Sequence, residues 1–262
     1  MSVNRIVGIL IQEYYITKRS LEVIMDLFFF TAMSFLAFGL VALSLFKSGN
    51  QTAGSFLLIG IIFWEVIRVN QYSMSVGSLW NIWSKNLSNM FVTPISIHEY
   101  LFAHMISGLL KSLLIFIFIV ILAILLYGFN IFDLGISNIS ASFINMIIFS
   151  WSVGIIILGV IFRYGTRIQA FAWGLIFLFQ PLTAAFFPLE ILPKFVQYIA
   201  YLFPPTFVFE ALRGNVSDST FNITYQSIAL AENIFYFVFS IWLFNILFNR
   251  SKETGQFANN ET

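Results

Sequence analysis

The chain has 262 residues, of which 59% are hydrophobic and only 10% are charged. A soluble domain of this size cannot hide so much apolar surface, including 33 Phe residues, so the composition excludes an ordinary soluble protein. The absence of cysteine excludes disulfides, thiolate catalysis and thiolate metal sites. The net charge of +1 gives no indication of nucleic-acid binding. We therefore expect an all-α integral membrane protein that is surrounded mainly by lipid.

The first 22 residues predict an amphipathic helix that lies along the membrane surface. Its apolar positions recur at helical spacing and are Val3, Ile6, Val7, Leu10, Ile11 and Tyr14. Polar residues lie away from that face or at its border, and they are Asn4, Arg5, Gln12 and Glu13. Lys18 and Arg19 would then reach the headgroups of the cytoplasmic leaflet. A cytosolic tail without fixed structure is the alternative.

Six segments are predicted to cross the membrane. A helix rises about 1.5 Å per residue, so about 20 mainly apolar residues span a hydrocarbon core of about 30 Å. Five apolar runs meet this description best, and they cover 25–46, 106–127, 143–162, 171–188 and 234–248. The remaining segment, about 55–79, begins apolar and then becomes polar. It is counted as a span because of the charge distribution.

With six spans both ends of the chain lie on the same side, and the basic residues then divide unequally. On the side of the two ends lie Arg5, Lys18, Arg19, Lys85, Lys111, Arg163, Arg167, Arg250 and Lys252. On the other side lie only Lys47, Lys194 and Arg213, while Arg68 falls within a span. Because cytoplasmic loops carry the excess of Lys and Arg, we expect both termini, including the tail 250–262, on the cytoplasmic side of the plasma membrane.

Segment 55–79 carries Glu65 and Arg68 at membrane depth, where each charge costs about 2.5 to 3.5 kcal/mol on insertion scales. The two residues are three positions apart and thus neighbours on one helical face, and Tyr72 and Ser75 continue the same stripe. This stripe should face protein or water and never lipid. Two interpretations remain open, a polar lining of a translocation route or subunit seam, and an ion pair that only stabilises the fold.

Residues 80–95 predict a short cytoplasmic helix of about three turns. Its apolar face consists of Trp80, Trp83, Leu87, Met90 and Phe91. Thr93 and Pro94 end it, because the residue before a proline disfavours the helical conformation. Ser96 and Glu99 then have the spacing of a capping box, which starts the next helix. Such an element suits the docking of a soluble partner, and an interfacial helix without a partner is the alternative.

A stretch near the C-terminus holds five of the six prolines, which are Pro181, Pro188, Pro193, Pro204 and Pro205. It is apolar but too interrupted for one spanning helix. Two short helices within 189–214, roughly 193–203 and 205–214, would enter the outer leaflet and return, with their turn at Pro204 and Pro205. Glu210 and Arg213 would pair at the outer surface.

This layout resembles the ABC-2 permease family, the membrane subunits of type-2 ABC exporters. The resemblance covers essentially the whole chain, and two segments carry it best. The segment NMFVTPISIHEYLFAHMISG is similar to the family's stretch ending in Leu/Phe-x-Thr-Pro, although Lys85 is the only charged residue shortly before it. The segment PLEILPKFVQYIAYLFPPTFVFEALRG is similar to the family's proline-rich stretch that ends in Glu-x-x-Arg.

The resemblance implies that two permease subunits, identical or different, pair within the lipid membrane. Each would dock on one copy of a cytoplasmic ATPase, so that the complex contains two ATPase subunits. No Gly-x4-Gly-Lys-Ser/Thr phosphate loop occurs in this chain, so ATP and Mg would bind to the ATPase, and we expect no cofactor, metal or nucleic acid on the permease itself. We also expect no enzymatic activity of its own. The exported molecule would be amphipathic, such as a lipid-linked glycan, a lipid or a hydrophobic drug.

Three groups of residues are assigned roles by this resemblance. The ATPase-docking residues would be Trp83, Lys85, Leu87, Met90, Phe91, Thr93 and Pro94. The translocation path would be lined by Glu65, Arg68, Gln71, Tyr72, Ser75, Phe177 and Gln180. The outer gate would comprise Pro193, Pro204, Pro205, Glu210 and Arg213.

Two other classes of function remain as alternatives. An ion-coupled secondary transporter would use an intramembrane carboxylate as a relay, and Glu65 is the only deep candidate. A membrane-embedded enzyme would need a catalytic constellation, yet the only histidines, His98 and His104, are expected to be interfacial polar residues. Neither an HExxH nor a GxSxG motif is present.

Overall fold

The computed structural model describes residues 1–218 and 221–254, apart from the side chains at positions 88, 91, 215, 217 and 218. Most of the expected tail, 255–262, thus lies outside the described residues. Every regular element in the described part of the chain is a helix. The prediction of an all-α protein is therefore confirmed.

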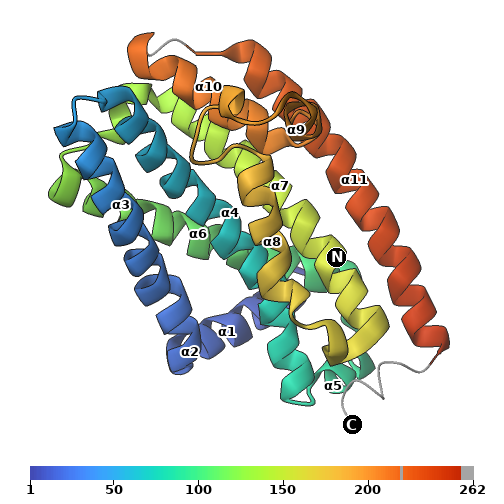
Figure 1. Ribbon diagram of the computed structural model, residues 1–262. Helices are drawn as coiled ribbons and strands as arrows, with labels where there is room; N and C mark the ends of the chain where they lie inside the picture. The colour runs from blue at the N-terminus through green and yellow to red at the C-terminus, as the bar shows by residue number, and fades with distance from the viewer. Residues whose placement is uncertain (219–220, 255–262) are drawn as a thin grey trace.

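The N-terminal helix α1 (Val3–Arg19) crosses one end of the long helices (Figure 1). It ends at Ser20, whose hydroxyl accepts a hydrogen bond from the backbone N–H of Val23 and so starts α2 (Leu21–Ile24). The chain continues through the π-helical turn η1 (Met25–Phe30) into α3 (Thr31–Lys47). Together the residues from Leu21 to Lys47 form the first helix that is long and apolar enough to cross a membrane.

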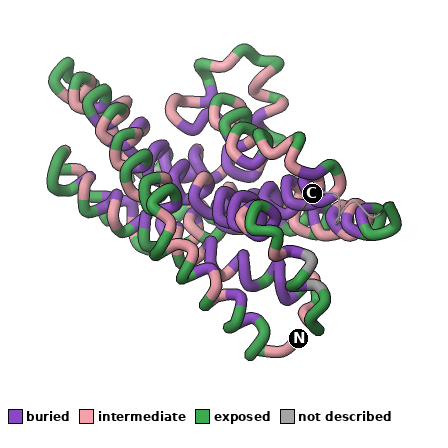
Figure 2. Tube along the Cα trace, turned by 90° about the horizontal axis from the view of Figure 1, so that it is seen from below, coloured by how far each residue is buried: buried purple, intermediate pink, exposed green. Residues whose placement is uncertain are grey.

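Four further helices meet the same criterion, and they are α4 (Gln51–Trp83), α6 (Ile97–Tyr127), α7 (Ile136–Tyr164, continued by η3, Gly165–Ile168) and α11 (Ile223–Glu253). In their most apolar windows, 72% of the residues of α4 and α7 are buried, against 28% for α6 and 22% for α11. The helices α4 and α7 therefore form the core, and the outer helices leave apolar side chains exposed for lipid. Figure 2 shows buried residues gathered in the middle of the bundle and exposed residues along its periphery.

Two predicted spans begin too late, because hydrophobicity alone misses polar first turns. The helix α7 begins at Ile136 instead of position 143, and α11 begins at Ile223 instead of position 234. The helix α6 begins at Ile97, directly after the predicted cap and before the apolar run that starts at position 106. A side-chain cap fixes the starts of α6 and α11. Ser96 caps α6 and Asn222 caps α11, each by accepting a hydrogen bond from a backbone N–H three residues later.

The predicted span 171–188 is shorter than expected. Its helix, α8 (Phe171–Leu182), has 12 residues and is thus about 18 Å long, which is less than a bilayer core. Pro181 lies in its last turn, and Ala184, with a φ of 51°, then takes the left-handed conformation that turns the chain.

The proline-rich stretch contains η4 (Leu189–Ile191), α9 (Lys194–Ala200) and α10 (Pro204–Asp218). The helices α9 and α10 are bent by 103° relative to each other at a short break, so the predicted interruption before Pro204 is present. By length and composition this bent pair is the candidate for a sixth span or a re-entrant loop. Two short elements, α5 (Leu87–Val92) and η2 (Ile131–Leu134), complete the chain.

Candidate translocation site and docking segment

A cavity of about 520 Å³ lies between η1 and α3 on one side and α4 and α8 on the other. Six of the seven residues predicted to line a path face it, and they are Glu65, Arg68, Gln71, Tyr72, Phe177 and Gln180. The seventh, Ser75, does not line it but lies one turn further along α4 and bonds to Gln71. The polar stripe of α4 thus faces protein and a cavity, as its sequence pattern requires.

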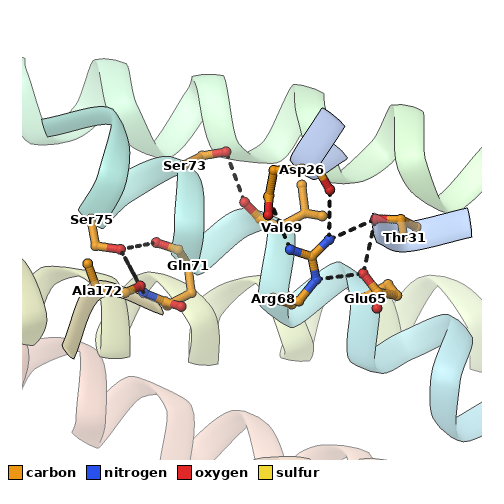
Figure 3. A network of polar contacts seen from close by, with 9 residues as sticks. All are labelled: Asp26, Thr31, Glu65, Arg68, Val69, Gln71, Ser73, Ser75 and Ala172. Carbon is orange, nitrogen blue, oxygen red and sulfur yellow. Dashed lines mark hydrogen bonds and ion pairs between the residues drawn. The ribbon is translucent and has the colours of Figure 1, made fainter. Parts of the chain in front are cut away.

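An ion-pair network borders this cavity (Figure 3). The guanidinium of Arg68 donates from Nε to Glu65 Oε2 at 2.7 Å and from Nη1 to Asp26 Oδ2 at 3.1 Å. Its Nη2 donates to Thr31 Oγ1 at 2.7 Å, and Thr31 donates to Glu65 Oε2 at 3.2 Å. The predicted pair of Glu65 and Arg68 is confirmed, and the network shows that it extends to two other elements.

The sequence reasoning missed Asp26 and Thr31. They come from η1 and α3 and lie 42 and 37 positions before Arg68, so helical spacing cannot reveal the contact. The one available signal was Asp26 itself, a carboxylate at the start of a long apolar run. It lies in a π-helical turn, a rare local structure that is frequent at functional sites.

The stripe of α4 also holds α8 in place. Gln71 Nε2 donates to the carbonyl oxygen of Ala172 at 3.0 Å, and Ser75 Oγ donates to the same oxygen at 3.2 Å. Both side chains are buried, so these bonds form where water cannot compete. The part of α8 that lines the cavity is therefore hydrogen-bonded to the polar face of α4.

The predicted docking helix is divided between two elements. Trp83 belongs to the end of α4 and not to a separate helix, and its ring stacks on Trp173 of α8 with ring centroids 6.1 Å apart. Its indole N–H donates to Gln169 Oε1 at 3.2 Å. Trp83 is still 37% exposed, so one edge of the ring faces outward at the end of the bundle.

A turn at Lys85 separates these elements. Lys85 has a φ of 54°, in the left-handed region that glycine usually occupies after a helix. Its N–H donates to Ile82 O at 2.9 Å, and the N–H of Asn86 donates to Asn81 O at 2.9 Å, which is the Schellman pattern. The side chain of Lys85 is exposed. The predicted docking helix thus cannot run continuously from 80 to 95.

The shorter helix α5 carries the remaining predicted docking residues. Leu87 and Met90 are buried, so they anchor the helix to the body of the protein, whereas the side chain of Phe91 lies outside the described residues. Thr93 ends α5 in an extended conformation and precedes the exposed Pro94, as predicted. We call 84–95, from the end of α4 to the start of α6, the docking segment.

The start of α6 and the first turns of α1 hold the docking segment from both flanks. The predicted capping box is confirmed, because Glu99 N donates to Ser96 Oγ at 3.2 Å and Ser96 N donates to Glu99 Oε2 at 2.9 Å. Glu99 also accepts a hydrogen bond from Ser2 N at 2.6 Å, and Arg5 bonds to Pro94 O. Near the end of α4, Gln12 Nε2 of α1 donates to Asn81 Oδ1 at 2.7 Å.

The residues of α1 that pack inward differ from those predicted. Glu13 was placed at the border of the apolar face and His104 at the membrane interface, yet Glu13 is only 2% exposed and His104 is fully buried. The reason is that α1 packs on α6 through Ile6, Ile9 and Glu13, which share one helical face. Val3, Val7, Ile11 and Tyr14 remain exposed on the other side, where they suit a membrane surface.

Glu13 accepts hydrogen bonds at Oε2 from Lys111 Nζ at 3.0 Å and from Ser107 Oγ at 3.3 Å. His104 Nδ1 lies 3.8 Å from its other oxygen. Burial raises the pKa of Glu13, but the charges of Lys111 and His104 and the hydrogen bonds outweigh burial, so the pKa is lowered. Glu13 is therefore a buried carboxylate that stays ionised and ties α1 to α6.

The proposed gate residues lie around the turn that follows α8. Glu210 and Arg213 pair at 2.8 Å, as predicted, but Arg213 is only 6% exposed and does not lie at the surface. Its Nη2 donates to the carbonyl oxygens of Ala184 and Ala185, so the guanidinium holds a turn whose own backbone leaves these acceptors free. Pro193 precedes α9, and Pro204 and Pro205 form the first turn of α10.

Among the described residues, no group of three or more His, Asp or Glu side chains is arranged to hold a metal ion. The structure thus combines several helices that could cross a membrane with a partly polar cavity between them. Residues 83–248, more than half of the chain, match the family described as ABC-2 family transporter protein. The chain belongs to this family.

The membership confirms the resemblance that the proline-rich and Thr-Pro segments indicated. The match begins at Trp83, so it includes the docking segment and extends through most of α11. ABC-2 proteins are membrane components of ABC transporters, so this ABC-2 permease is a multi-pass transport subunit, not itself catalytic, and the family implies association with an ABC ATPase. No curated protein matches the chain.

Proposed function

We propose that this ABC-2 permease exports an amphipathic molecule from the cytoplasm across the plasma membrane, driven by two copies of a separate ATPase that binds ATP and Mg. One observation carries the proposal. The docking segment follows directly on α4, which forms one wall of the cavity and supplies most of the cavity's polar residues. A movement of this segment, caused by the ATPase, would therefore be transmitted to the cavity along α4 and through the hydrogen bonds between α4 and α8.

The route of that movement follows contacts already described. Trp83, at the end of α4, stacks on Trp173 of α8, and the neighbouring Ala172 accepts the hydrogen bonds of Gln71 and Ser75. The helices α4 and α8, which form one side of the cavity, are thus connected next to the docking segment. In this proposal, Lys85 and the exposed side of α5 contact the ATPase, with Thr93 and Pro94 fixing the angle at which α6 begins.

At the opposite end of the path, the bent pair α9 and α10 would form the outer gate. Arg213 holds the turn after α8, and Ala185 of that turn packs on Gly60 of α4, so the gate contacts the same two helices as the cavity. A second permease subunit, identical or different, would complete the path along the open side of α3, α4 and α8. Both termini would lie in the cytoplasm.

A secondary transporter is disfavoured by the state of its only deep relay candidate. Glu65 accepts hydrogen bonds from Arg68 and Thr31, and Arg68 is also paired with Asp26. These contacts give Glu65 a structural role in the packing of η1, α3 and α4, and no second deep carboxylate was predicted that could continue a relay.

Co-purification from membranes of the native host tests the proposal. The wild-type chain should recover an ATPase subunit that carries a phosphate-binding Gly-x4-Gly-Lys-Ser/Thr loop. A variant that combines Lys85→Glu with Met90→Pro reverses the exposed charge and breaks α5, so recovery should fall by about tenfold or more, a loss of at least 1.4 kcal/mol. Lys47→Glu, the same charge reversal in the predicted outer loop, is the control and should change nothing. Absence of an ATPase with every chain would contradict the proposal.

A further inference from the structure

The charges that border the cavity do not cancel. Among the described residues, the acidic and basic side chains that line it are Asp26, Glu65 and Arg68, which are two carboxylates and one guanidinium. The excess is one negative charge. Because the cavity is bordered mainly by apolar side chains, this charge acts with little screening on whatever enters.

The guanidinium uses four of its five N–H groups within the network, whereas one oxygen of Glu65 takes no part in the network. All three nitrogens of Arg68 donate to Asp26, Thr31 or Glu65. Glu65 makes both of its contacts through Oε2, and among the described residues Oε1 has no hydrogen-bond partner, although Glu65 is only 2% exposed. Figure 3 shows this second oxygen directed away from the guanidinium. The cavity thus offers a buried anionic acceptor and no free cation.

Aromatic rings supply the rest of the wall. The rings that line the cavity are Phe30, Phe38, Trp64, Tyr72, Trp173 and Phe177. Faces of Trp, Tyr and Phe attract cations, and desolvated sites of this kind bind cations with apolar substituents. The volume of about 520 Å³ lies within the usual range of small-molecule sites.

We propose that this cavity binds a lipophilic cation, a molecule with one positive charge and a bulky apolar or aromatic body. The inference rests on the proposed function, since it names the substrate class of the same path. The positive charge would lie by Glu65 Oε1 and Asp26, and the apolar body would pack on the aromatic rings. An anionic lipid or a phosphate-linked glycan would bring a further negative charge to a site where the guanidinium of Arg68 is already paired with two carboxylates.

A pair of ions with nearly the same shape and opposite charge tests the inference. Tetraphenylphosphonium and tetraphenylborate would be measured by equilibrium binding to the full-length chain in phosphatidylcholine nanodiscs, with binding to empty nanodiscs subtracted. The wild-type chain should bind the phosphonium at least about tenfold more tightly than the borate. Equal affinities, or tighter binding of the borate, would overturn the inference and favour a neutral or anionic substrate.

Variants place the effect in the cavity. Glu65→Gln keeps the shape of the side chain and removes the excess charge, so the affinity for the phosphonium should fall about five- to tenfold while that for the borate stays or rises. Asp26→Asn removes the same charge from η1 and should act in the same direction, which keeps the test decisive if one variant folds poorly. Glu253→Gln removes an exposed carboxylate from the end of α11, outside the cavity, and should leave both affinities unchanged.

This measurement needs no ATPase, so it separates the two proposals. Selective phosphonium binding that both cavity variants weaken supports the inference, whatever co-purifies with the chain. A chain that recovers its ATPase but shows no preference for the phosphonium would refute the cationic substrate and leave the export function standing. An unchanged preference in Glu65→Gln and Asp26→Asn would move the binding site out of this cavity and equally refute the inference.

Discussion

Glu13 is a charged residue whose role depends on its three-dimensional surroundings. It lies on a helix that faces a membrane surface, yet its carboxylate is buried against α6, where Lys111 and Ser107 donate to one oxygen. Gly77 of α4 packs beside the same group, because a Cβ there would lie 3.4 Å from Glu13 Oε2. One side chain therefore joins α1 to both helices that flank the docking segment.

We expect Glu13→Gln to destabilise the chain by about 1.5 to 3 kcal/mol, because a charged hydrogen bond is lost and Lys111 keeps an unpaired charge. Lys111→Gln alone should cost a similar amount. The double variant should cost clearly less than the sum, since neither charge is then left alone. Thermal unfolding of the purified chain in one detergent measures all three.

Glu253→Gln, at an exposed position near the end of α11, is the control and should leave the unfolding temperature unchanged. Strictly additive effects of the two single changes would mean that Glu13 and Lys111 do not interact.

The contacts that could be predicted from the sequence are the ones that helical geometry sets locally. Glu65 with Arg68, Glu210 with Arg213, and the capping box at Ser96 all lie within one turn, so spacing was sufficient. The contacts that were missed join distant segments. The bond between Lys111 and Glu13 spans 98 positions, and no periodicity in one sequence encodes which helix another one packs on.

At the scale of elements, the turn after α8 is held from two sides. Gly60 of α4 lies so close to the turn that a Cβ would overlap the carbonyl oxygen of Ala185. Arg213 of α10 donates to the same oxygen and to that of Ala184. Hydrophobicity alone favoured a full span over 171–188, because the close approach at Gly60 and the left-handed Ala184 have no signal in a hydropathy profile.

Gly60→Ala should therefore destabilise the chain by about 1 to 3 kcal/mol, because the added methyl group forces the backbone of the turn away from α4. Gly174→Ala is the matched control. It is also a helical glycine, but no atom outside its own helix lies within 4 Å of its Cβ position, so the change should be neutral or stabilise by up to about 1 kcal/mol. Unfolding temperatures of both variants check this, and equal effects would contradict the close approach.

For the whole molecule, α1 is the element that connects the two flanks of the docking segment. Gln12 bonds to Asn81 near the end of α4, while Arg5 bonds to Pro94 and Glu99 at the start of α6. The helices α4 and α6 also pack directly on each other, so α1 adds a bridge between the two ends that flank the docking segment. With α1 in place, the two helices respond together, and the cavity that α4 borders changes shape as a unit.

Arg5→Gln should uncouple ATP hydrolysis from transport without releasing the ATPase. The change removes the bond to Pro94 and the ion pair with Glu99 at 3.5 Å but leaves the proposed contact residues of the docking segment intact. In liposomes that contain the permease–ATPase complex, we expect a normal amount of bound ATPase, basal hydrolysis within about twofold of wild type, and accumulation of tetraphenylphosphonium reduced about fivefold or more.

Lys18→Gln removes the same charge from the same helix at an exposed site, so it reproduces any loss of attraction to anionic lipid and should transport normally. If Arg5→Gln transports as well as Lys18→Gln, then α1 acts only as a membrane anchor, and the coupling between the docking segment and the cavity runs through α4 and its contact with α8 at Trp83 and Trp173.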